Sequence, residues 1–112
     1  MEPRIKLWLE NDGGVAISGY RVRLLKHVAD TGSLAEAARR MGLSYRRAWG
    51  KVKEMETNLG VRLVHSEAGG PGGGRTRLTP EGERLVDLYP RFEAAAERDV
   101  RRRFSKVFGE RA

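Results

Sequence analysis

Residues 33–59 read SLAEAARRMGLSYRRAWGKVKEMETNL, and this stretch decides the fold. Ser33 opens a Ser-x-x-Glu capping box, which predicts the start of a short helix. Gly42 is well placed as the left-handed residue that ends this helix, and Ser44 can cap a second helix directly after it. Two helices joined by a turn of three residues are typical of a helix-turn-helix, which we predict over residues 33–58.

The sequence before this motif predicts one strand and one helix. Residues 4–9 alternate basic and apolar side chains and then meet turn residues at 11–14, which is typical of a short strand. Trp8 is expected to be a strand residue that covers one edge of a second sheet, the hairpin predicted below for residues 61–78. Ser18 can cap a helix over residues 19–30, because the apolar residues of that segment fall on one side.

The sequence after the motif predicts a hairpin and a long helix. Apolar residues recur with a period of two after Gly60, a glycine-rich run occupies 68–74, and a second short strand pattern follows at 75–78. A hairpin directly after a helix-turn-helix is a wing, here residues 61–78. Pro80 suits the first position of a last helix that runs from residue 80 to about 108.

The predicted fold class is α+β and mainly helical, a winged helix-turn-helix in the order β-α-α-α-β-β-α. The chain has 112 residues, which fits one domain. We expect residues 1–79 to form the winged helix-turn-helix, to which the charge and residue patterns described next assign DNA binding. Residues 80–112 are expected to form a C-terminal dimerisation helix of the same domain.

The charge favours polyanionic partners. Lys and Arg number 22 against 15 Asp and Glu, a net charge of +7, which suits nucleic acid first and acidic membrane surfaces second. The chain has no cysteine and therefore no disulfide, thiolate metal site or thiol nucleophile. No apolar run is long enough to span a membrane, so we expect a soluble, cytoplasmic protein.

The residue patterns of enzymes are missing from the sequence. His27 and His65 stand alone, without a carboxylate at the spacing of a metal or catalytic site, and are expected to be surface or structural residues. The glycine run ends in Gly74-Arg-Thr and leads into a strand, whereas a phosphate-binding loop needs Gly-Lys-Ser/Thr before a helix. We therefore predict no catalytic activity, no metal and no cofactor.

The second helix of the motif is the candidate reader of the DNA major groove. Ala48, Val52 and Met55 have helical spacing and are expected in the core. Trp49, next to Ala48, is interpreted as a packing residue rather than a base-stacking group. The alternative to DNA contact by this helix is that its basic residues form a solvated face beside the core. The predicted contacts of this helix with double-stranded DNA are Ser44, Tyr45, Arg46, Arg47, Gly50 and Lys53.

The wing and the last helix carry further candidates. Arg75, Arg77 and the glycine amides of the wing are expected to approach phosphates, although a merely mobile hairpin loop is the alternative. The arginines of residues 98–103 fit either a second phosphate contact or a solvated helix face. An apolar stripe along the last helix predicts a homodimer, helped by the first helix. The predicted dimerisation residues are Val22, Leu85, Tyr89, Phe92, Ala96, Val100 and Phe104.

Four segments resemble the N-terminal DNA-binding domain of ModE-type, molybdate-responsive regulators, and more distantly the LysR-type regulators. They are residues 31–38, 41–49, 68–74 and 78–82, and the likeness extends from about residue 4 to 95. The resemblance implies a winged helix that dimerises through its first and last helices and acts at promoters.

ModE-type regulators carry molybdate-binding domains after this region, whereas the chain stops at Ala112. We therefore expect no tight molybdate binding by this chain alone, and an effector could be sensed by a separate protein. The predicted function is a sequence-specific transcriptional regulator that binds an inverted-repeat operator as a homodimer. The alternatives are a nonspecific architectural DNA-binding protein and an interaction module that docks a separate sensor.

Overall fold

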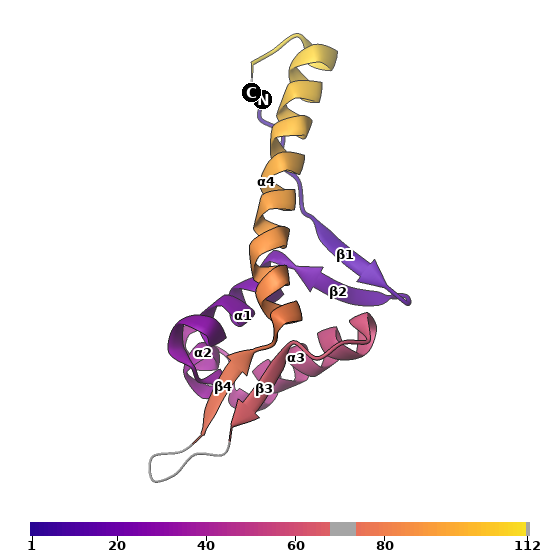
Figure 1. Cartoon of the computed structure of the whole chain (residues 1–112). Helices are drawn as coiled ribbons and strands as arrows, with labels where there is room; N and C mark the ends of the chain where they lie inside the picture. Colours follow the sequence, from indigo (N-terminus) through magenta and orange to yellow (C-terminus); the bar gives the residue numbers. More distant parts are fainter. Residues whose placement is uncertain (68–73, 112) are drawn as a thin grey trace.

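The computed structural model describes residues 1–67 and 74–111, and it confirms a mainly helical α+β winged helix-turn-helix (Figure 1). It contains one strand more than predicted, in the order β1-β2-α1-α2-α3-β3-β4-α4. The glycine-rich tip of the wing, predicted to approach phosphates, lies outside the described residues apart from Gly74. The elements are β1 (Trp8–Asn11), β2 (Gly14–Ser18), α1 (Gly19–Thr31), α2 (Leu34–Arg40), α3 (Tyr45–Leu59), β3 (Val64–Glu67), β4 (Arg75–Leu78) and α4 (Pro80–Phe108).

Helix α2 begins at the predicted serine, but its capping box is only half formed. The Ser33 hydroxyl accepts a hydrogen bond from the Glu36 amide at 3.0 Å. The Glu36 carboxylate does not return to Ser33, because it binds the guanidinium of Arg39 instead. The Ser33 amide donates to the Thr31 hydroxyl at 3.2 Å, so the donor is satisfied by another side chain.

The turn between α2 and α3 has the predicted chemistry. Gly42 has φ of +68°, a left-handed conformation that glycine adopts without strain. The Leu43 amide donates to the Ala38 carbonyl at 2.9 Å, and the Ser44 hydroxyl accepts from the Arg47 amide at 3.2 Å. This turn brings the fully buried Ala37 and Ala38 of α2 into the core that α3 also lines.

The N-terminal strand was predicted at residues 4–9, but it occupies Trp8–Asn11 and pairs with a second strand as a hairpin. Strands β1 and β2 pair antiparallel across Asp12 and Gly13, which both have positive φ. An Asp-Gly pair between two strand-like runs is the usual sequence of such a two-residue turn, so the signal was present. Trp8 lies in a strand, β1, as expected, but it does not cover the wing sheet, because β1–β2 and the wing β3–β4 are separate sheets.

The wing begins later than predicted, at Val64 rather than Val61. Val61 is exposed, whereas Leu63 is fully buried. The Glu56 carboxylate on α3 accepts hydrogen bonds from the backbone amides of Leu63 at 2.7 Å and Val64 at 3.2 Å. It also pairs with the Lys53 ammonium at 2.9 Å. A carboxylate that is only 8% exposed thus fixes the start of the wing to the helix before it.

Helix α4 starts against the same short segment. The Thr79 amide donates to the Leu63 carbonyl at 2.9 Å, and the Thr79 hydroxyl donates to the Arg62 carbonyl at 2.6 Å. Gly82 is buried beside this carbonyl, and a Cβ on it would lie only 2.3 Å from the Leu63 oxygen. Glycine is therefore required for the close approach of α4 to the base of the wing.

Two adjoining clusters of buried side chains form the core. The larger one lies among α1, α2, α3 and the wing, and the smaller one joins β2, α1 and α4 through Ile17, Val22 and Tyr89. Leu85 and Val86 of α4 pack against both clusters. The second half of α4 extends away from these cores, as Figure 1 shows.

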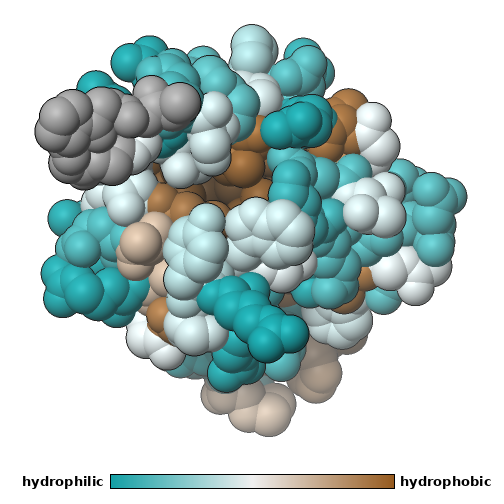
Figure 2. Space-filling model, turned by 90° about the horizontal axis from the view of Figure 1, so that it is seen from below, coloured by the Kyte–Doolittle hydropathy of each residue, from teal (hydrophilic) through white to brown (hydrophobic). Residues whose placement is uncertain are grey.

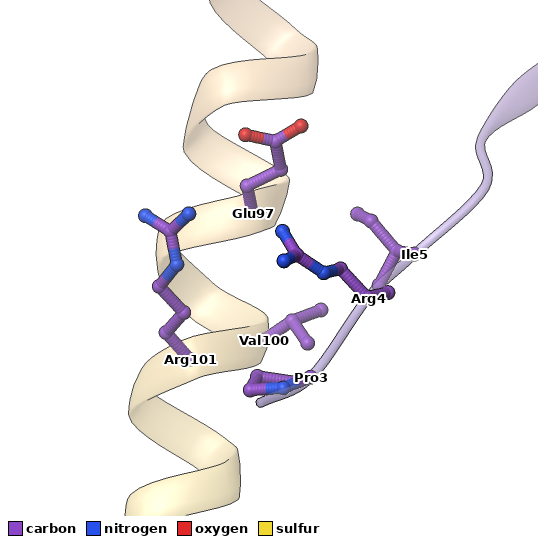
Figure 3. Close-up of a pocket in the computed structure, with 6 residues that line it drawn as sticks. All are labelled: Pro3, Arg4, Ile5, Glu97, Val100 and Arg101. Atoms are coloured by element: carbon purple, nitrogen blue, oxygen red, sulfur yellow. The ribbon is translucent and has the colours of Figure 1, made fainter. Parts of the chain in front are cut away.

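The N-terminal segment runs alongside this extension of α4. The Tyr89 hydroxyl donates to the Leu7 carbonyl at 2.9 Å, and the N-terminal ammonium pairs with Glu110 at 3.1 Å. Between these contacts, Pro3, Arg4 and Ile5 face Glu97, Val100 and Arg101 across a shallow pocket (Figure 3). In the described part of the chain, no helix is long and apolar enough to cross a bilayer.

Replacing Glu56 should reveal how much the buried carboxylate contributes. Glu56→Ala leaves two buried amides without an acceptor and should lower the free energy of unfolding by about 2 kcal/mol or more. Urea denaturation followed by circular dichroism measures this loss. Glu54→Gln on the same helix is the control, because its ion pair with Arg21 involves an exposed carboxylate and should contribute less than about 1 kcal/mol.

The contribution of Glu56 should also depend on pH. Burial raises the pKa of Glu56, but the hydrogen bonds from Leu63, Lys53 and Val64 outweigh burial and leave this pKa below the ordinary 4.5. A carboxylate with a lowered pKa in the folded state stabilises the protein above its unfolded pKa and loses that effect as the pH falls through the folded value. The stability difference between wild type and Glu56→Gln should therefore shrink below pH 4.5. A difference that stays constant down to pH 2 would contradict this assignment.

Candidate nucleic-acid interface

Helix α3 presents two different faces. Ala48, Val52 and Met55 are fully buried in the core, as predicted. The opposite face is exposed at Arg46 and Gly50. A helix held by one apolar face, with basic side chains on the other, has the shape and charge that fit the major groove.

The arginines at the start of α3 have no acidic partner. Among the residues that the structure describes, neither Arg46 nor Arg47 forms an ion pair, whereas Arg39 of α2 is paired with Glu36. Tyr45 and Ser44 beside them are exposed as well, although the Ser44 hydroxyl is engaged as the helix cap. The two guanidinium groups therefore remain available for phosphates or guanine edges.

Gly50 is a glycine without an internal packing reason. A Cβ added at this position would meet nothing within 4 Å, in contrast to the crowded Gly82. A glycine in the middle of a helix is about 1 kcal/mol less favourable than alanine. Within the part of the chain that the structure describes, no contact explains this cost.

Lys53, a predicted DNA contact, also makes contacts within the chain. Its ammonium pairs with Glu56 at 2.9 Å and lies 5.3 Å from the centre of the Trp49 ring. Trp49 was interpreted as a packing residue next to the core face, but the structure leaves it 48% exposed. The position of Trp49 in the sequence could not decide whether its side chain is buried, because it lies at the border between the buried and exposed faces of α3.

The wing arginines lie on one strand beside the turn that precedes α2. Arg75 and Arg77 are both exposed on β4, and Arg77 is 3.4 Å from the Glu67 carboxylate across the hairpin. The Thr76 amide donates to the Gly32 carbonyl at 2.9 Å, and the Arg75 guanidinium lies over this glycine. The base of the wing is thus attached to the helix-turn-helix on a second side.

The helix-turn-helix and the wing share one end of the molecule, viewed in Figure 2. Hydrophilic side chains cover most of this face around a hydrophobic hollow near its centre. His65 is exposed on β3 opposite Arg77, and His27 lies on α1 with its Nδ1 atom lacking a hydrogen-bond partner. Within residues 1–67 and 74–111, no group of acidic, histidine or cysteine side chains could hold a metal ion.

The predicted dimerisation residues divide into two groups. Val22 and Tyr89 are buried in the core of their own chain, so they have little surface left for a partner. Burial, and to a lesser extent the nearby Glu93, raise the pKa of the Tyr89 hydroxyl to about 12. Leu85 is also partly covered by the core. The residues that retain accessible apolar surface on α4 are Phe92, Ala96, Val100 and Phe104, with Leu88, Val107 and Phe108 beside them.

The family comparison covers both the helix-turn-helix and the wing of this interface. The model of the bacterial regulatory helix-turn-helix proteins of the lysR family matches residues 20–83. The DNA-binding domain of CbnR, solved in complex with DNA, superposes with a TM-score of 0.59 at 23% identity, covering 81% of this chain and 99% of that one. ArgP from Mycobacterium tuberculosis superposes with a TM-score of 0.55 at 22% identity, covering 74% of this chain and 29% of that one.

Sequence relatives include two bacterial proteins that are much longer. The molybdenum-pterin-binding protein MopB of Rhodobacter capsulatus is 42% identical over 72% of this chain and 30% of its own length. The DNA-binding transcriptional dual regulator ModE of Escherichia coli is 38% identical over 80% of this chain and 34% of its own length. The chain thus spans about a third of the length of these relatives. With the family model covering more than half of its residues, the chain belongs to the lysR family of bacterial regulatory helix-turn-helix proteins.

Proposed function

We propose that this chain is the DNA-binding part of a transcriptional regulator and that it recognises a specific inverted repeat as a homodimer. The observation that carries the proposal is the exposed face of α3, where Arg46 and Arg47 form no ion pair with any described residue and Gly50 leaves the helix surface open. The similarity to ModE of Escherichia coli, a DNA-binding regulator by name, supports the same function. The chain shares its fold with the DNA-binding domain of CbnR, which was solved in complex with DNA.

The two elements contribute different contacts. Arg46 and Arg47 on α3 are placed to read base edges, because the first turns of a recognition helix enter the major groove. Arg75 and Arg77 on the wing contact the phosphate backbone, which adds affinity without sequence information. Lys53 has a lesser role, because Glu56 already neutralises much of its charge.

The homodimer rests on the second half of α4. This half extends beyond the core and presents Phe92 at 49% exposure and the stacked rings of Phe104 and Phe108, whose centres are 4.9 Å apart. A two-fold dimer would bury this apolar surface by isologous contact. It would also place two copies of α3 about 34 Å apart, or a multiple of that distance, so that the target is an inverted repeat.

Arginine substitutions should separate base reading from phosphate contact. On a duplex selected from random DNA, Arg46→Ala or Arg47→Ala should cost about 1–3 kcal/mol of binding free energy and relax the preference at one base pair. Arg75→Ala should weaken all sequences alike and reduce the slope of log K against log salt by about 1. Fluorescence anisotropy at several salt concentrations measures both effects.

The matched control is Arg91→Ala on α4, which removes the same charge from an exposed arginine paired with Asp87. It should leave sequence preference unchanged. If Arg75→Ala relaxes the preference and both α3 variants weaken all sequences equally, the wing reads the bases and the assignment is wrong.

Gly50→Ala should change stability and DNA binding in opposite directions. The added methyl group meets open space, so the free energy of unfolding should rise by about 0.5–1 kcal/mol. The same methyl group should hinder close approach to the groove and weaken binding to the selected duplex. Thr57→Ala, an exposed position at the far end of the same helix, should raise helix propensity without weakening binding. Unchanged DNA affinity of Gly50→Ala would remove the close-approach argument.

Phe92→Glu should shift the protein toward a monomer, because a charge would replace a half-exposed ring on the proposed interface. Sedimentation velocity at micromolar concentration should show a dimer for wild type and a smaller species for the variant. Val61→Glu places the same charge on an exposed residue near the wing and should leave the dimer intact. A monomeric wild-type protein at this concentration would end the dimer proposal.

A further inference from the structure

Trp49 is an exposed indole on the helix proposed to enter the major groove. The ring is 48% exposed, while its neighbour Ala48 is fully buried and its other neighbour Gly50 has no side chain. Aromatic side chains dominate the energetics of interfaces, because they bury a large apolar area with few rotatable bonds. An exposed indole at this position can therefore bury apolar area against a binding partner.

The surroundings of Trp49 form a stripe along α3. Tyr45 precedes it by one turn and is 56% exposed, and Lys53 follows it by one turn. Residues four apart lie on the same side of a helix, so the two rings and the ammonium share one side of α3. The stripe borders the base-reading positions of the proposed interface, because Arg46 lies three residues before Trp49.

The indole is held in place before any partner arrives. The Lys53 ammonium lies 5.3 Å from the ring centre, a distance at which a cation is attracted to the ring face. Lys53 is itself held by Glu56, whose carboxylate is fixed by the amides of Leu63 and Val64. This chain of contacts links the ring to the base of the wing. Such preorganisation lowers the entropic cost of binding.

The major-groove edge offers one apolar group that suits an indole. Hydrogen-bond donors and acceptors make up the edges of guanine, cytosine and adenine, whereas thymine adds a C5 methyl group. We propose that Trp49 is a specificity-determining residue that packs against a thymine methyl group in the target duplex, with the Lys53 ammonium facing the neighbouring phosphate. The inference rests on the proposed DNA-binding function and deepens it.

Removing single methyl groups from the DNA tests this contact directly. The probe is the duplex that wild type selects from a random pool, with each thymine replaced in turn by deoxyuridine. Burying one methyl group stabilises a complex by about 0.8 kcal/mol, so wild type should lose about fourfold in affinity at one position of each half-site. Trp49→Ala should bind the parent duplex more weakly than wild type does. Replacing the sensitive thymine by deoxyuridine should not lower the affinity of this variant any further. Trp49→Phe should retain part of the uracil penalty.

Trp8 provides the matched control, because it is 46% exposed on the separate N-terminal hairpin. Trp8→Phe should keep the full uracil penalty and leaves Trp49 as the sole tryptophan of the chain, whose emission should change when the selected duplex is added. The far-ultraviolet circular dichroism of each variant confirms that the helices are intact.

Three results would overturn the inference: no position sensitive to uracil, a uracil penalty that persists in Trp49→Ala, or Trp49 emission that is unaffected by the duplex. Each of them leaves specific DNA binding in place. Failure of the proposed function itself would instead appear as no sequence selected by wild type, so the two failures are distinguishable.

Discussion

The buried carboxylate of Glu56 is the contact on which the arrangement of the DNA-facing elements depends. It belongs to α3 and accepts hydrogen bonds from the first two residues at the base of the wing, Leu63 and Val64. A buried charge is tolerated only when its hydrogen-bonding capacity is met, and here two amides and the Lys53 ammonium meet it. Helix and wing are therefore joined by directional bonds, which fix their relative position more narrowly than apolar packing alone.

The same short segment also connects the wing to α4. The Leu63 carbonyl accepts from the Thr79 amide, and Gly82 lets the first turn of α4 approach that carbonyl closely. The direction of the long helix is thus set by backbone contacts at the wing. In the proposed dimer this direction governs the spacing of the two copies of α3. Residues 62–64 consequently connect the elements of the proposed DNA contact to the helix of the proposed dimer interface.

Local signals in the sequence predicted most of the helical framework, because helix ends are determined by neighbouring residues. Ser33, Ser44 and Thr79 accept from amides three residues later, and Gly60 and Gly109 adopt left-handed conformations after α3 and α4. The N-terminal hairpin was missed although Asp12-Gly13 signals it, since only five residues follow before α1. Glu36 has two possible partners within one turn, and Arg39 competes successfully with the Ser33 amide.

The sequence by itself determined the elements, the basic face of α3 and the family, since these depend on the order of residues along the chain. The tertiary structure alone decided which borderline side chains are covered. Periodicity placed Tyr89 in the dimerisation stripe, and Trp49 was interpreted as a packing residue next to the core face. In the structure Tyr89 is buried within its own chain and Trp49 is half exposed. Both lie at the edge of an apolar helix face. Burial there depends on whether another element passes over it: the N-terminal segment reaches Tyr89 through Leu7, whereas the ring of Trp49 is contacted by Lys53 of its own helix and stays 48% exposed.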